Sequence, residues 1–130
     1  MKKMFAFAAL AVATVAGAAF AAEGYSLAVA GGKGKVNEKI TSTITVTAKG
    51  DHHVNKEYPH KVLLTAPEGV KVDAKVMGVV ASETTLTFTV VSTHAAAGTK
   101  PIGGEVKFAT CTPSSCIPAV EKVTINATAQ

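Results

Sequence analysis

The chain has 130 residues, of which 13 are lysine and none arginine, against 9 acidic residues, for a formal net charge of +4. So small an excess of positive charge, carried without a single guanidinium group, argues against nucleic-acid binding, which relies on bidentate arginine contacts. The length suits one domain with one hydrophobic core.

The N-terminus has the pattern of an export signal. Two lysines after the initial Met precede an apolar run over 4–16, and small residues stand at Ala19 and Ala21. The run is shorter than the roughly 18 residues that a membrane span needs, and A-x-A is a signal-peptidase site. We therefore predict a cleaved signal peptide, 1–21, and a single mature domain, 22–130. After cleavage we expect no stable membrane insertion, and we expect the mature domain in the bacterial periplasm.

The mature sequence alternates apolar and polar residues. The pattern is clearest over 39–49 and 84–92, where isoleucine, leucine, valine and phenylalanine alternate with threonine. A period of two predicts strands with one buried face. Five further strands are predicted over 25–30, 60–66, 70–76, 104–110 and 121–127.

Segments rich in glycine and proline separate these strands. They predict turns at 31–34, 50–51, 67–69, 98–101 and 113–115. About seven or more short antiparallel strands in one domain predict an all-β, immunoglobulin-like sandwich. The chain has no Trp, and its two cysteines are too close in sequence to bridge two sheets, so it is not an antibody-type domain.

The chain has two cysteines, Cys111 and Cys116, between the predicted strands 104–110 and 121–127. A hairpin tip at this place would present the pair to solvent, where another thiolate could attack it. A disulfide closing a loop of about six residues stabilises the fold by only about 2 kcal/mol. From the residues alone, thiol exchange and a structural cross-link remain equal alternatives.

Three segments resemble a known family. The hairpin from Phe108 to Pro118, continuing into 122–125, the run 49–62 and the turn 67–70 are similar to the N-terminal periplasmic domain of the thiol:disulfide interchange reductase DsbD. The resemblance extends over roughly 25–127, and the cysteine hairpin is its most specific part.

The resemblance implies an immunoglobulin-like redox carrier, a component of a protein-disulfide reductase, that works without a cofactor. The cysteine pair would accept electrons from a thioredoxin-like partner and pass them to periplasmic thiol proteins. Cys116 would form the mixed disulfide and Cys111 would resolve it. The chain lacks that family's membrane conduit and thioredoxin-like domain, so we expect electrons to come from a separate protein.

Two further details depart from the resembled family. The cysteine spacing is one residue shorter. The family's acidic pair and aromatic cap are missing from 74–78, where only Met77 could cover the sulfurs.

The rival hypothesis is a non-catalytic periplasmic binding module with a structural disulfide, either a copper or zinc carrier or an interaction domain. His52, His53, His60 and His94 could contribute to a copper or zinc site. Adjacent residues of a strand point to opposite faces, which weakens a shared role for His52 and His53. Either of these two could instead lie beside the cysteine hairpin.

Overall fold

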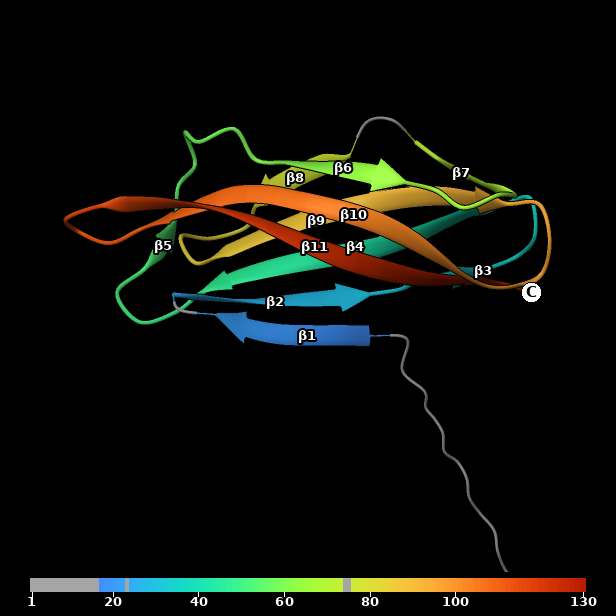
Figure 1. Ribbon diagram of the computed structural model, residues 1–130, viewed down its shortest axis with the longest axis horizontal. Coiled ribbons are helices and arrows are strands. Elements are labelled where there is room, and N and C mark those ends of the chain that lie inside the picture. Colours follow the sequence, from blue (N-terminus) through green and yellow to red (C-terminus); the bar gives the residue numbers. More distant parts are fainter. Residues whose placement is uncertain (1–16, 23, 74–75) are drawn as a thin grey trace, which may run out of the picture.

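The computed structural model describes residues 17–22, 24–73 and 76–130, and every regular element in them is a β-strand (Figure 1). Two sheets pack face to face. The first sheet contains β1 (Gly17–Ala22), β2 (Tyr25–Ala30), β4 (Lys39–Ala48), β9 (Thr85–His94), β7 (Val70–Val72) and β8 (Met77–Val80). The second contains β3 (Lys33–Gly34), β11 (Cys116–Ala129), β10 (Gly98–Cys111), β5 (His53–Val54) and β6 (Lys61–Thr65).

The core lies between the sheets because each central strand buries alternate residues. In β4 every second side chain is buried from Ile40 to Ala48, and β9 repeats the pattern from Leu86 to His94. Phe88 from the first sheet and Phe108 from the second are fully buried. The predicted all-β, immunoglobulin-like single domain is confirmed.

Short strands complete the edges of both sheets. β7 and β8 pair one after the other with β9, and β5 and β6 do the same with β10. The pairing of β3 with β11 is parallel, whereas all other described ladders are antiparallel.

All seven predicted strands are present, but four were missed: β1, β3, β5 and β8. The predicted turn over 98–101 is wrong, because β10 already begins at Gly98. The buried pair Ile102 and Ile125 belongs to a ladder that continues to the Gly98–Ala129 pair. The chain turns just before Gly98, which has a φ of 126°.

The end of the predicted signal peptide lies in β1, which pairs antiparallel with β2. The rest of that segment, 1–16, is outside the described residues, and its cleavage stays a prediction. Across the described ranges, the chain forms no helix with the length and hydropathy needed to cross a bilayer.

His94 ends β9 inside the core, where it is fully buried. Its Nε2 lies 3.0 Å from Ser92 Oγ, while its Nδ1 has no hydrogen-bond partner among the described residues. Burial, and then the positive charge of Lys100, lower the pKa of His94 below its usual 6.5. The folded chain therefore favours the neutral imidazole more strongly than the unfolded chain does.

We predict that the free energy of unfolding falls as the pH drops from about 7 to about 5. In this range the unfolded chain binds a proton at His94 with the ordinary pKa of about 6.5, whereas the folded chain resists it. Urea titrations at pH 7, 6 and 5 measure the slope, which should be shallower in His94→Gln. Equal slopes for the two proteins would contradict the assignment.

Candidate functional site

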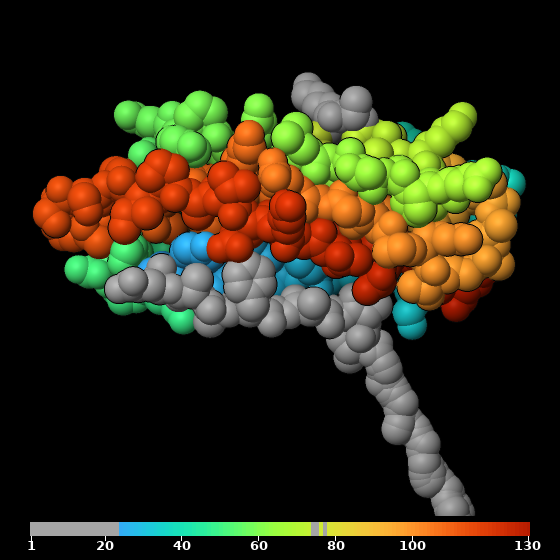
Figure 2. Space-filling view, in the orientation of Figure 1, coloured from blue at the N-terminus to red at the C-terminus, as the bar shows by residue number. Residues whose placement is uncertain are grey.

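The two cysteines form a disulfide at the tip of the β10–β11 hairpin. They are the last of a continuous series of paired residues that starts at Gly98 and Ala129. The tip projects at one end of the long axis of the molecule (Figure 2). Cys111 is only 4% exposed, whereas Cys116 is exposed. Solvent therefore reaches the disulfide mainly from the Cys116 side.

The loop that joins the two cysteines is held by Thr112. Its backbone N–H donates to the Ser115 carbonyl at 2.7 Å. Its hydroxyl accepts from the backbone N–H groups of Ser114 and Ser115, at 3.3 and 3.2 Å. Such side-chain-to-backbone bonds are typical of tight turns. The loop is thus ordered by bonds other than the disulfide.

The short strand β5 lies beside Cys111. His53 is opposite Cys111 in the ladder, and the buried Val54 is opposite Thr110. Val54 N–H also donates to the Glu83 carbonyl at 2.7 Å, in the turn before β9. This segment is therefore hydrogen-bonded both to β10 of the second sheet and to the turn that precedes β9 of the first.

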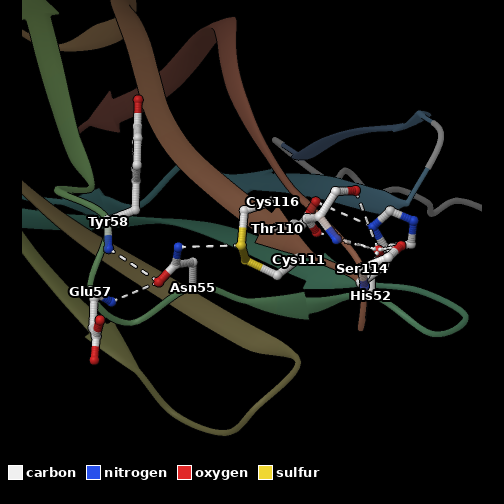
Figure 3. The surroundings of a disulfide bond; sticks show 10 residues. His52, Asn55, Glu57, Tyr58, Thr110, Cys111, Ser114 and Cys116 are labelled. Atoms are coloured by element: carbon white, nitrogen blue, oxygen red, sulfur yellow. Dashed lines mark hydrogen bonds between the residues drawn. A yellow bond between two sulfur atoms is a disulfide. The ribbon is translucent and has the colours of Figure 1, made fainter.

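Asn55 follows β5 and reaches the disulfide (Figure 3). Its backbone N–H donates to the Ala109 carbonyl at 3.0 Å. Its side-chain Oδ1 accepts from the N–H groups of Glu57 at 2.9 Å and Tyr58 at 3.3 Å. Its Nδ2 lies 3.7 Å from Cys116 Sγ. Sequence reasoning missed Asn55. An asparagine at the start of a polar segment indicates a local bend, but it does not indicate the contact with Cys116.

His52 lies beside the hairpin, as expected for one of the two adjacent histidines. Its Nδ1 is 3.4 Å from Thr110 Oγ1. Its ring packs against Gly24, where an added β-carbon would lie 2.6 Å from His52 Cε1. Gly24 also has a φ of +90°, which disfavours any other residue.

The other histidines are elsewhere. His53 is exposed on β5, and the ring of His60 packs against Phe88 with a centroid distance of 5.9 Å. β9 begins at Thr85, just after the Glu83 turn that bonds Val54 beside the hairpin tip. His94 lies at the other end of this strand, nine residues or about 30 Å away at 3.3 Å per residue. The described residues contain no group of three His, Cys, Asp or Glu side chains that could hold a metal ion.

Tyr25 links the first sheet to the hairpin. Its hydroxyl donates to the Glu121 carboxylate on β11, and its ring meets Phe108 edge-on at 4.9 Å. Burial first, and then the hydrogen bond and charge of Glu121, raise the pKa of Tyr25 to about 12. The phenol therefore stays protonated at neutral pH.

The predicted cover by Met77 stays untested. Ala74, Lys75 and the side chain of Met77 lie outside the described residues, although the Met77 backbone belongs to β8.

Comparison with known proteins supports the fold alone. No family model and no curated protein sequence matches the chain. Among solved structures, the N-terminal periplasmic domain of ScsB from Proteus mirabilis superposes with a TM-score of 0.54 at 7% identity. The match covers 87% of this chain and 52% of that one, so the chain spans about half of the ScsB domain.

Two yeast domains are similar to the same degree. The GAE domain of GGA2p from Saccharomyces cerevisiae gives a TM-score of 0.53 at 11% identity, covering 82% of this chain and 93% of that one. The yeast GGA1 GAE domain gives 0.51 at 10% identity, covering 84% and 97%.

We predict that Gly24→Ala destabilises the protein by more than Gly69→Ala. Both positions have positive φ, +90° and +84°, so both substitutions strain the backbone by on the order of 1 kcal/mol. At Gly69 no atom lies within 4 Å of the added carbon, whereas at Gly24 the His52 ring must move. Denaturant titrations of the two variants measure the difference. Equal losses would show that His52 does not pack as described.

Proposed function

We propose that this chain is a periplasmic thiol:disulfide interchange domain that passes electrons through Cys111 and Cys116 between thioredoxin-like partners. The observation that carries the proposal is the unequal exposure of the two cysteines, because Cys111 is 4% exposed and Cys116 is open to solvent. A thiolate on another protein can approach Cys116 Sγ, while Cys111 is screened by its own domain.

The exchange takes place in two displacements. A partner thiolate attacks Cys116 Sγ, the intramolecular S–S bond breaks, and Cys111 leaves as a thiolate that takes up a proton. The partner's second thiolate then attacks the partner's own sulfur in the mixed disulfide, the bond to Cys116 breaks, and Cys116 leaves as a thiolate that takes up the second proton. Two electrons and two protons have moved from the partner dithiol to the pair. Transfer to an acceptor disulfide runs the same steps in reverse, with Cys116 attacking and Cys111 resolving.

A purely structural role explains the disulfide less well. Antiparallel pairing already joins β10 and β11 along their whole length up to the cysteines, and Thr112 orders the loop. The short ring adds only about 2 kcal/mol in the chain-entropy model. Structural bridges are usually protected from attack, whereas one sulfur here is exposed.

The compartment is supported by two observations. The N-terminal pattern of a signal peptide predicts export, and one similar fold is that of a periplasmic domain, ScsB. An oxidising compartment would allow the disulfide to form.

Single-cysteine variants test the proposal. We expect Cys111→Ser, converted at Cys116 to a mixed disulfide with thionitrobenzoate, to form a stable adduct with a reduced thioredoxin that lacks its resolving cysteine. Cys116→Ser, treated in the same way, is the matched control, because it also lacks the disulfide but keeps only the buried thiol. Adducts are counted on non-reducing gels, and at least about tenfold more should form with Cys116. No adduct, or equal amounts, would overturn the proposal.

A further inference from the structure

The orientation of the Asn55 amide is determined by its neighbours. Two backbone N–H groups, of Glu57 and Tyr58, point at one side-chain atom, and only an oxygen can accept both bonds. The other amide atom is therefore the nitrogen, and it is this atom that lies 3.7 Å from Cys116 Sγ (Figure 3). If the amide were flipped, its NH₂ group would face the two N–H donors, and neither hydrogen bond could form.

The backbone around Asn55 is also held in place. Its own N–H donates to the Ala109 carbonyl, and the preceding Val54 bonds to Glu83. The amide thus approaches the sulfur from a segment that is hydrogen-bonded on both sides. Within the described residues, this is the one side-chain hydrogen bond to either sulfur of the pair.

A donor at this position acts differently on the two redox states. A disulfide sulfur is a weak acceptor, whereas a thiolate carries a full charge and accepts strongly. A hydrogen bond to the charged form of a group favours that form. The bond therefore strengthens when the pair is reduced and Cys116 loses its proton, while Cys111 has no such donor among the described residues.

We propose that Asn55 is a positioning residue that donates Nδ2–H to the Cys116 thiolate, so that the negative charge of the reduced pair is held on the exposed sulfur. This inference rests on the proposed function for its use, but the contact itself does not depend on a partner. The amide neither gains nor loses a proton. It keeps Cys116 ready to attack an acceptor disulfide, and it makes Cys116 the better leaving group when the donor's second thiolate attacks the mixed disulfide.

Other titratable groups surround the pair without bonding to it. In Figure 3 the side chains of Glu57 and Tyr58 project away from the disulfide and His52 lies on the Thr110 side, while His53 lies opposite Cys111 in the ladder. None of these side chains has a hydrogen bond to either sulfur in the structure. The effect of Asn55 on the thiol is therefore separable from theirs by substitution.

The test is the rate of iodoacetamide alkylation at Cys116 in the reduced, full-length protein, followed from pH 5 to 10 with the labelled cysteine identified by peptide mass. Asn55→Asp keeps an oxygen to accept from Glu57 and Tyr58 but removes the donor. Asn126→Asp, exposed on β11 and paired with Pro101 far from the tip, adds the same charge as a control. Measurement at 0.05 and 1 M salt separates charge repulsion, which salt screens, from the lost hydrogen bond.

We expect Asn55→Asp to lower the alkylation rate near pH 7 by roughly tenfold, because the loss of one hydrogen bond to a charged group has an effect of about this size. The midpoint of the pH profile should move upward at both salt concentrations. Asn55→Ala should show the same loss at 1 M salt, and Asn126→Asp should match the wild type. A shift that disappears at 1 M salt, or an unchanged profile in Asn55→Ala, would overturn the inference. Because alkylation needs no partner, this result is independent of whether exchange with thioredoxin occurs.

Discussion

The register of the β10–β11 ladder is the constraint on which the site depends. The two strands pair without interruption from the buried Ile102 and Ile125 to Cys111 and Cys116. A slip of one residue would turn the apolar face of β11 toward solvent, so core packing determines which residues meet at the tip. The disulfide is therefore placed by the core of the domain as well as by its own loop.

The unequal environments of the two sulfurs follow from what lies beside this ladder. β5 pairs with β10 next to Cys111 and leaves Cys116, on the outer strand, open. The same segment continues into Asn55, whose amide faces the open sulfur. One short stretch of chain thus lies beside one sulfur and supplies a donor to the other, and the proposed exchange would use this asymmetry.

The fold was predictable where burial repeats with a period of two, as in β4 and β9, because such a pattern depends only on local sequence. β5 was not, since a two-residue strand exists only through its pairing with Thr110 and Cys111. The hairpin position of the cysteines was predicted from the strands on either side. The contact of Asn55 with Cys116 was not, because it joins residues 61 positions apart and depends on how the edge of the sheet is completed.

The most direct test of the central claim is the reduction potential of the Cys111–Cys116 pair. The purified mature protein is equilibrated with dithiol and disulfide buffers of known potential, and the oxidised fraction is measured by thiol labelling. An exposed, exchangeable pair should lie above about −300 mV, in the range of labile disulfides. A value well below about −300 mV, typical of protected structural bridges, would contradict the account.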